Sequence, residues 1–313
     1  MLKRPKITVV GSAGNVGASV IQWCAQKELG DLVLIDLKPK VAQGRALDLA
    51  QGGSFGGFSV NFTATDDSAQ MQDSDVIVVT AGVPRKPGQT REELVGINAG
   101  ITKGICENVK KYAPNSILII VSNPLDAMLT VAQKVTGFPR ERVIGMSGVL
   151  DSSRFRCNIA RFLNVHVNDV SAIVIGAHTD KDMVPVVSTA TVGGVPLAKL
   201  LNAEQLTDIV DRTKRGGAEL TELIGTSAWV APGFGVTAMV ESIVLNQGRI
   251  LPCSVELKGE FGISDACLCV PVKLTNKGAE KVFDFDLSAN ETTALKSAHS
   301  AYLEIKKIAL SSI

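Results

Sequence analysis

Short runs of apolar, mostly β-branched residues alternate with longer segments of helical spacing over the first half of the chain. The apolar runs are Ile7–Val10, Leu32–Ile35, Val60–Phe62, Val76–Thr80, Ser116–Val121 and Val143–Gly145. Helical spacing covers Val16–Lys27, Val41–Gln51, Arg91–Tyr112 and Pro124–Val135. A run that is apolar at every position is buried on both faces of its sheet, so these runs predict a parallel sheet covered by helices. We therefore expect a doubly wound α/β domain.

The strict alternation of predicted strands and helices ends at about residue 149, after which strands and helices are grouped in blocks. Helical spacing covers Asp151–Phe162, Ala203–Ile224, Ala231–Leu245 and Asn290–Ile308. Strand-like runs cover Val170–Ile175, Met183–Val187, Ile250–Leu257 and Leu268–Leu274. This order is typical of a mixed α+β domain. We expect two domains, residues 1–148 and residues 149–313.

Composition excludes several classes of protein. The 313 residues carry a net charge of +1, which gives no support to a nucleic-acid partner. No apolar stretch approaches the roughly 20 residues of a membrane span, and the first apolar run is too short for a signal peptide. The cysteines form no CxxC pair, so we expect reduced, mostly buried thiols in a cytoplasmic protein and no metal site. They are Cys24, Cys106, Cys157, Cys253, Cys267 and Cys269.

A glycine-rich turn follows the first apolar run and opens the first helical segment. It reads Gly11-Ser-Ala-Gly14-Asn15-Val16-Gly17. Glycines there permit a tight turn, close approach of the backbone to a pyrophosphate, and close packing of helix on strand. The helix N-terminus then offers free N–H groups to phosphates. The spacing is one residue longer than the usual GxGxxG, so a turn that is merely rich in glycine is the alternative.

Asp36 favours the nucleotide interpretation of that turn. It ends the second apolar run, 19 residues after Gly17. An acidic side chain at this place hydrogen-bonds the ribose hydroxyls of NAD and repels the extra phosphate of NADP. A solvated aspartate at a strand end is the alternative, but its position behind the glycines makes NAD the expected cofactor.

Hydride transfer at an alcohol carbon needs a group that accepts the hydroxyl proton near neutral pH, and histidine suits this task. Of the three histidines, His166 is expected in a turn and His299 in the last helix, whereas His178 follows a buried strand. Asp151 and Arg154 lie three residues apart on one predicted helix face. The carboxylate could orient the imidazole, and the guanidinium could grip a substrate carboxylate. An ordinary intrahelical ion pair is the alternative.

Two predicted loops lie at the carboxyl edge of the sheet, where such folds bind ligands. The loop Thr80–Arg91 is punctuated by Gly and Pro and carries Arg85 and Arg91, which suit a bound anion. A basic, solvated loop is the alternative. The segment Val121-Ser-Asn123-Pro124 follows the fifth run, and Asn123 can hydrogen-bond a nicotinamide or a substrate hydroxyl.

The order and spacing of these motifs resemble the lactate/malate dehydrogenase family over essentially the whole chain. The resemblance rests on Gly11–Gly17, Asp36, Gly82–Arg91, Asn98, Val121–Pro124, Leu150–Phe155 and His178. It implies a Rossmann-type NAD-binding domain followed by a catalytic domain. It also implies an oxidoreductase that acts on a small 2-hydroxy acid and assembles as a homo-oligomer, a dimer or a tetramer.

The resemblance further implies a role for each polar side chain. His178 would accept the proton, paired with Asp151, and Arg154 would bind the first substrate carboxylate. Arg91 would polarise the carbonyl oxygen, and Asn123 would hold both substrate and cofactor. The residues expected at NAD are Gly11, Gly14, Asn15, Val16, Gly17, Asp36, Asn98, Val121 and Asn123.

Arg85 separates malate from lactate as the expected substrate. In the family this loop position carries glutamine in lactate dehydrogenases and arginine in malate dehydrogenases. Pyruvate would leave a buried guanidinium unpaired, at a cost of about 3–5 kcal/mol, whereas oxaloacetate brings a second carboxylate. We therefore expect NAD-dependent interconversion of (S)-malate and oxaloacetate. A lactate or broad 2-hydroxy-acid dehydrogenase is the nearest alternative, and a non-catalytic NAD-binding sensor is the alternative from another class.

One segment departs from the family pattern. After His178 the chain reads Thr179-Asp180-Lys181-Asp182-Met183, with a threonine in place of the usual glycine and one residue extra. We expect the backbone beside the histidine to differ from that of its relatives.

Overall fold

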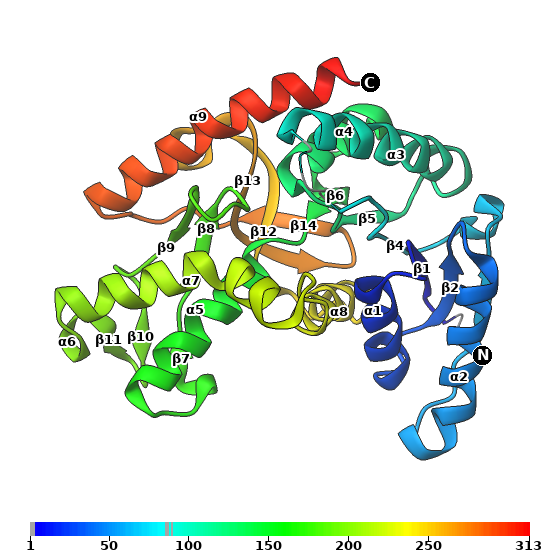
Figure 1. The fold of residues 1–313 in the computed structure, drawn as a ribbon, viewed down its shortest axis with the longest axis horizontal. Helices are drawn as coiled ribbons and strands as arrows, with labels where there is room; N and C mark the ends of the chain where they lie inside the picture. Colours follow the sequence, from blue (N-terminus) through cyan, green and yellow to red (C-terminus); the bar gives the residue numbers. More distant parts are fainter. Residues whose placement is uncertain (1–3, 85–87, 89) are drawn as a thin grey trace.

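The computed structural model describes residues 4–84, 88 and 90–313. A parallel sheet organises its first half (Figure 1). The strand order is β3-β2-β1-β4-β5-β6, in which Val9 of the central β1 lies opposite Leu34 and Val78 of its two neighbours. The strands are β1 (Lys6–Val10), β2 (Asp31–Ile35), β3 (Phe62–Thr65), β4 (Val76–Val79), β5 (Ile117–Ile120) and β6 (Val143–Gly145). This arrangement confirms the predicted doubly wound fold.

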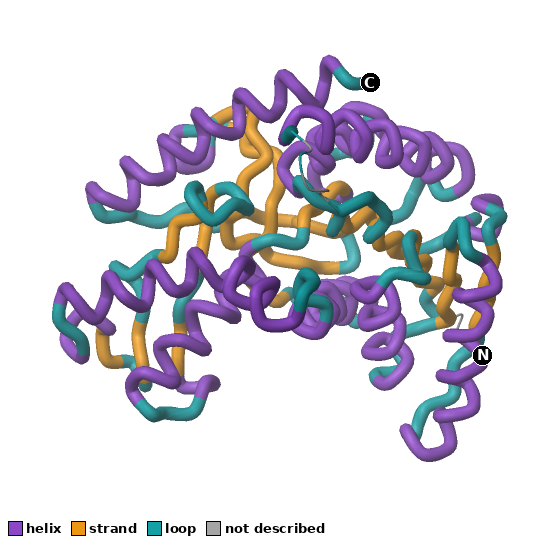
Figure 2. Tube along the Cα trace, in the orientation of Figure 1, coloured by secondary structure: helices purple, strands orange, loops and turns teal. Residues whose placement is uncertain are grey.

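Helices cover both faces of this sheet (Figures 1 and 2). One face carries α3 (Arg91–Tyr112) and α4 (Leu125–Thr136), which pack against the C-terminal α9 (Ala289–Ser311). On the other face α1 (Asn15–Gln26) packs against α8 (Val230–Val244). All four residues of β4 are 0% exposed, which explains why this strand is apolar at every position. The remaining helix of this half, α2 (Pro39–Gly56), follows β2.

The second half extends the same sheet with antiparallel strands. β12 (Arg249–Lys258) pairs with β6 at Ser254 and Gly145, and along its length with β13 (Ser264–Thr275). β8 and β9 continue the sheet beyond β13, and β14 also pairs with β13, while β7, β10 and β11 form a small separate sheet. The other elements are α5 (Gly148–Leu163), β7 (Val170–Ser171), β8 (Val174–Gly176), β9 (Met183–Pro185), β10 (Thr191–Val192), β11 (Val195–Pro196), α6 (Leu197–Leu200), α7 (Ala203–Ile224) and β14 (Gly278–Val282).

A shared hydrophobic core holds the two halves together. Buried residues from β1 through α9 form one continuous cluster, which includes Ile7, Leu118, Val255 and Tyr302. The phenol of Tyr302 shares a hydrogen bond of 2.9 Å with the Thr130 hydroxyl inside this cluster. The sheet and the core therefore fix the position of one half relative to the other.

Local signals determine where α3 begins. The Thr90 hydroxyl accepts the backbone N–H of Glu93, and the Glu93 carboxylate accepts the N–H of Thr90, which completes a capping box. Acidic residues in the first turn and lysines in the last turn complement the helix dipole. This cap fixes the helix start directly after the predicted ligand loop.

Several predicted elements need correction. The run Val170–Ile175 is not one strand, because β7 and β8 are separated by two residues and belong to different sheets. The backbone turns away between them, and the N–H of Val174 donates to the Ser152 hydroxyl at 2.8 Å. The third strand is Phe62–Thr65 rather than Val60–Phe62. The short elements β10, β11 and α6 were not predicted, because two to four residues carry no periodic signal.

The burial of the cysteine side chains agrees with the expectation from composition. All six cysteines are free, and five of them are buried, Cys157 being the partly exposed one. Within the part of the chain that the structure describes, no helix combines the length and apolar character needed to cross a membrane.

Close contact between α1 and the glycine-rich turn makes Gly17 sensitive to substitution. A Cβ at Gly17 would lie 2.5 Å from the Gly11 carbonyl oxygen. Gly17→Ala should lower the free energy of unfolding by about 1–3 kcal/mol, measured by urea denaturation. Gly104→Ala is the matched control, since Gly104 lies in α3 with nothing within 4 Å of an added Cβ. It should be neutral or stabilising by up to about 1 kcal/mol, and equal losses in both variants would contradict the close-packing argument.

Candidate active site

Asp151 joins the imidazole of His178 and the guanidinium of Arg154. Its Oδ2 accepts a hydrogen bond of 2.7 Å from Nδ1 of His178, and its Oδ1 accepts one of 3.1 Å from Nη1 of Arg154. The side chain of Asp151 is 2% exposed, whereas those of Arg154 and His178 are 16% and 15% exposed. The carboxylate is thus buried behind two groups that retain contact with solvent. Nε2 of the imidazole is left free of this bond.

The fold brings this cluster together from α5 and the end of β8. The first turn of α5 presses against the sheet at Gly148, where a Cβ would collide with the Cys269 thiol and the Val174 carbonyl. Asp151 lies in this first turn, and Arg154 lies three residues further along the helix. His178 follows β8 after Gly176, which has a φ of +91° and turns the chain out of the sheet.

Thr179 closes the turn that follows His178. Its hydroxyl donates to Oδ2 of Asp182 at 2.7 Å and accepts the N–H of Asp182 at 3.1 Å. The N–H of Met183 donates to the Thr179 carbonyl at 3.1 Å. The threonine therefore stabilises the turn in this chain through its side chain, which a glycine could not do.

Opposing effects act on the pKa of His178, and the net effect raises it. Burial lowers the pKa, because the charged imidazolium is desolvated. The charge of Asp151, its hydrogen bond to the ring and the charge of Asp126 all raise the pKa, and together they outweigh burial and the smaller opposing charge of Arg154. The shift favours the protonated form of His178, which is the form that a proton donor to a carbonyl oxygen requires.

Two glycines of α7, Gly216 and Gly217, leave room for the side chain of Arg154. A Cβ at Gly216 would lie 3.0 Å from Cδ of Arg154, and one at Gly217 would lie 3.8 Å from its guanidinium nitrogens. Nε of Arg154 is buried without a hydrogen-bond partner among the described residues. With one nitrogen held by Asp151, the guanidinium has donors left for a carboxylate ligand.

The glycine-rich turn fits a dinucleotide. Gly11 has a φ of +90°, and a Cβ there would lie 2.6 Å from the backbone nitrogen of Ala81. α1 begins at Asn15 behind Gly14, with no side-chain cap on its first N–H groups, so these donors are available to phosphates. Asn15 is exposed and Val16 is half-buried beside Gly17. Binding of NAD by Gly11, Gly14, Asn15, Val16 and Gly17 remains a prediction that this geometry supports.

Asp36 lies directly after β2 and is hydrogen-bonded to the glycine-rich turn. Its Oδ2 accepts the N–H of Ala13 and its Oδ1 accepts the N–H of Lys38, both at 2.9 Å. Each oxygen keeps a further lone pair for a ribose hydroxyl. A contact between Asp36 and the ribose is compatible with these bonds and remains a prediction.

Asn98 ties two segments of the predicted site together. Its Nδ2 donates to the carbonyls of Asn123 at 2.7 Å and of Val83 at 3.1 Å, and its Oδ1 accepts the N–H of Val83. The residue is 1% exposed. Both amide hydrogens are therefore used within the protein, and only Oδ1 retains capacity for the predicted contact with NAD.

The segment after β5 presents one of its two predicted NAD-binding residues to solvent. Asn123 is exposed, whereas Val121 is buried. The peptide bond between Asn123 and Pro124 is cis. Arg91 is exposed at the start of α3, seven residues or two turns before Asn98, and so on the same side of that helix. No hydrogen bond or ion pair between described residues links Arg91 to His178 or Arg154.

Arg85 lies outside the described residues, so its predicted position at the substrate is not part of the observed geometry. The structure thus brings together three of the predicted polar groups, His178, Asp151 and Arg154. Arg91, at the start of α3, and Asn123, after β5, form no hydrogen bond with these three groups among the described residues.

Two residues at the site were missed from the sequence. Thr80 donates its hydroxyl to the carbonyls of Val10 and Gly11, both at 3.1 Å, and so secures the glycine-rich turn. Asp126 accepts the backbone N–H of His178 at 3.0 Å. An aspartate in the first turn of the helix after Asn123 was a visible signal, but nothing local indicates its distant partner.

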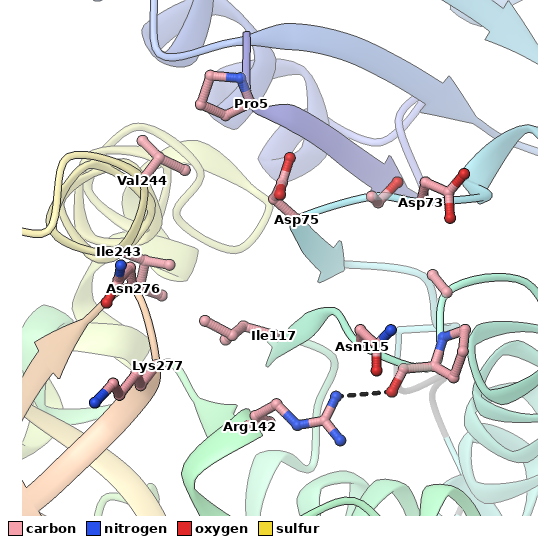
Figure 3. Close-up of a pocket in the computed structure, with 13 residues that line it drawn as sticks. Pro5, Asp73, Asp75, Asn115, Ile117, Arg142, Ile243, Val244, Asn276 and Lys277 are labelled. Atoms are coloured by element: carbon pink, nitrogen blue, oxygen red, sulfur yellow. Dashed lines mark hydrogen bonds between the residues drawn. The ribbon is translucent and has the colours of Figure 1, made fainter. Parts of the chain in front are cut away.

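A separate cavity of about 350 Å³ opens at the amino ends of β1, β4 and β5 (Figure 3). Asp75 and Ile117 line one side of the cavity, and Lys277 lines another. Arg142, which also lines the cavity, donates a hydrogen bond of 2.7 Å to the carbonyl of Pro114. This edge of the sheet is opposite to the glycine-rich turn, so the cavity does not belong to the candidate site. Across the described ranges, no group of three or more His, Cys, Asp or Glu side chains could hold a metal ion.

A doubly wound domain with an open glycine turn, joined to a histidine–aspartate pair beside an arginine that keeps donors for a ligand, is typical of a dinucleotide-dependent oxidoreductase. The family model for the lactate/malate dehydrogenase NAD-binding domain matches residues 5–145, and that for the α/β C-terminal domain of the same family matches residues 148–311. The chain belongs to the lactate/malate dehydrogenase family.

Its relatives include both branches of that family. A malate dehydrogenase of Parabacteroides distasonis is 48% identical, covering 91% of this chain and 92% of the relative. The crystal structure of Cryptosporidium parvum malate dehydrogenase matches with a TM-score of 0.94 and 37% identity, covering 98% of this chain and 99% of the other. The lactate dehydrogenase of the same organism, solved with lactic acid and NAD, matches with a TM-score of 0.95 and 36% identity over 99% of both chains. The fold alone therefore does not distinguish the two substrates.

The raised pKa of His178 can be measured directly. In an NMR titration of the three imidazoles, assigned by substitution, His178 should titrate above the ordinary value of about 6.5. In Asp151→Asn the pKa of His178 should fall, because burial then acts without the opposing carboxylate. A pKa of His178 that is the same in both proteins would contradict this account.

The same shift couples His178 to stability. Its pKa is higher in the folded state than in the unfolded state, so its contribution is complete below the unfolded pKa and is lost as the pH rises through the folded pKa. Asp151→Asn should therefore lose more stability on the acidic side of this window than on the alkaline side, as urea denaturation at several pH values would show.

Proposed function

We propose that this chain is an NAD-dependent malate dehydrogenase that interconverts (S)-malate and oxaloacetate. The observation that carries the proposal is the buried Asp151 carboxylate, which holds an imidazole and a guanidinium side by side. This pairing combines a proton donor with a carboxylate-binding group, the two functions needed at C2 of a 2-oxo acid. Membership of the lactate/malate dehydrogenase family supports the cofactor, and the malate dehydrogenase relatives support the acid.

In the proposed mechanism, Arg154 binds the carboxylate next to the reacting carbon through its free nitrogens. His178 donates its proton to the carbonyl oxygen during reduction and accepts it from the hydroxyl during oxidation. Asp151 fixes the ring with Nδ1 inward, so that Nε2 meets the substrate, and stabilises the imidazolium. NAD, when bound, supplies the hydride acceptor or donor. Arg91 would polarise the carbonyl oxygen, and Asn123 would orient substrate and cofactor.

Arg85 would bind the second carboxylate of the dicarboxylic acid. This assignment rests on the sequence position, because the residue lies outside the described part of the chain. The rival function is a lactate or broad 2-hydroxy-acid dehydrogenase, which the lactate dehydrogenase of Cryptosporidium parvum favours by its equal structural similarity. Comparison of oxaloacetate with pyruvate in one NADH-absorbance assay distinguishes the two functions.

We also propose that the protein is a cytoplasmic homo-oligomer, as the family resemblance implies. The homo-oligomer is supported by α2, which exposes large apolar side chains to solvent, namely Val41 at 44%, Leu47 at 60% and Phe55 at 97%.

His178→Asn tests the proton transfer. The variant should bind NADH with the affinity of the parent, measured by fluorescence, because the glycine turn is untouched. Its kcat for oxaloacetate reduction should fall by about 10²–10⁴-fold. Turnover close to that of the parent would remove His178 from the mechanism.

Arg85→Gln tests the choice of acid. Loss of the guanidinium leaves the second carboxylate of oxaloacetate without a partner, so kcat/KM for oxaloacetate should fall by about two orders of magnitude or more. The kcat/KM for pyruvate should rise, because an unpaired charge is no longer enclosed with it. Unchanged preference between the two acids would show that Arg85 does not select the substrate.

A further inference from the structure

A guanidinium from α2 lies against the glycine-rich turn and is not among the residues expected at NAD. Nη1 of Arg45 donates to the carbonyl oxygen of Gly14 at 3.2 Å, across 31 positions of the sequence. The same carbonyl accepts the N–H of Ala18 at 3.0 Å, in the first turn of α1. Arg45 is half-buried, so part of its side chain stays accessible to a ligand.

No carboxylate neutralises this guanidinium. Among the described residues, Arg45 forms no ion pair with an acidic side chain, and Asp48, three residues further along α2, is exposed to solvent. Asp36 is hydrogen-bonded to the turn, but its two oxygens accept the backbone N–H groups of Ala13 and Lys38. Arg45 therefore brings a positive charge to the turn without a partner of opposite charge.

The N-terminus of α1 adds to the positive potential at this place. Gly14 precedes the helix without a side-chain cap, and the first turn of the helix has no acidic residue. A helix N-terminus is equivalent to about half a positive charge. A guanidinium beside it is repelled unless an anion lies close to both. The helix end and the guanidinium thus favour the same kind of ligand.

The hydrogen bond to Gly14 does not by itself require a charged residue. The Gly14 carbonyl is already satisfied by the N–H of Ala18, and any neutral donor could form the second bond. A half-buried charge costs more to desolvate than a neutral side chain. The charge of Arg45 is therefore the feature to be explained.

The pyrophosphate of a dinucleotide is the anion that fits this place. In doubly wound folds it binds at the N-terminus of the first helix, and the NAD-binding family model covers this part of the chain. With Nη1 of Arg45 held by Gly14, Nε and Nη2 remain as donors. Charge-assisted bonds from such a fork to phosphate oxygens are stronger than those from neutral donors.

We propose that Arg45 is a further cofactor-binding residue, whose guanidinium strengthens the binding of NAD through the charge of its pyrophosphate. The inference rests on the proposed function, because it assumes that the glycine-rich turn holds NAD. α1 then supplies backbone donors to the pyrophosphate, and α2 supplies a cation from the side of Gly14.

The test compares ligands that contain or lack the pyrophosphate. In Arg45→Met the Kd values of NADH and ADP-ribose, measured by fluorescence and calorimetry, should rise about tenfold. The Kd of adenosine, measured by NMR titration, should stay within about twofold of the parent, because adenosine has no phosphate. Added NaCl should weaken ADP-ribose binding more in the parent than in Arg45→Met.

Lys40→Met is the matched control, because it removes an exposed cation from the first turn of the same helix. Its Kd for ADP-ribose should stay within about twofold of the parent. Arg45→Lys keeps the charge without the fork, so its Kd should lie between those of the parent and Arg45→Met. If Arg45→Met does not fold, Arg45→Gln takes its place with the same expected loss.

Two results would overturn the proposal. One is an unchanged Kd of ADP-ribose in the neutral variants, and the other is an equal loss for adenosine and ADP-ribose, which would mean that Arg45 only maintains the shape of the turn. At saturating NADH, kcat for oxaloacetate should stay close to that of the parent while KM for NADH rises, since the pyrophosphate is remote from the reacting carbon. A fall in kcat with unchanged KM would contradict this role.

Failure of the inference and failure of the proposed function give different results. If the function is wrong, the parent does not reduce oxaloacetate with NADH, yet the Kd of ADP-ribose still reports on Arg45. If only the inference is wrong, the parent reduces oxaloacetate while Arg45→Met binds ADP-ribose as tightly as the parent. A parent that binds no ADP-ribose overturns both.

Discussion

The buried carboxylate of Asp151 is the constraint on which the site depends. A charge that is 2% exposed is stable only with close partners, and Asp151 has two, the imidazole of His178 and the guanidinium of Arg154. Because each partner satisfies one oxygen, neither can move away without leaving one oxygen of the buried carboxylate without that hydrogen bond. The same interaction that stabilises the fold locally therefore also sets the tautomer of the histidine and the position of the arginine.

That cluster is held in place by the joining of the two halves into one sheet and one core. β6 ends the parallel part of the sheet, and α5, which carries Asp151, starts three residues later. β12 pairs with β6, and β13 connects β12 to β8, whose end presents His178. The catalytic half is thus positioned by backbone pairing, with the single contact of Asp126 adding a direct bond between α4 and the histidine.

Sequence patterns predicted the elements best where their signal was long or buried. The helices Arg91–Tyr112 and Ala203–Ile224 agree with the structure at both ends, because each has a capping box that marks its start. The run Val170–Ile175 was predicted as one strand because its residues are apolar, but the chain passes between two sheets inside it. Burial on both sides produces the same apolar pattern whether or not the strand is continuous.

The sequence by itself determined which chemical groups are available and in what order: the glycine turn, Asp36, the loop arginines, the pair on α5 and His178. Their spacing along the chain encodes local structure, which depends on neighbours within a few residues. Only the tertiary structure decided that Asp151 meets His178 across 27 positions and that Asp126 meets it across 52. Such contacts depend on how the sheet pairs and how the core packs, and these are properties of the whole chain that no short segment contains.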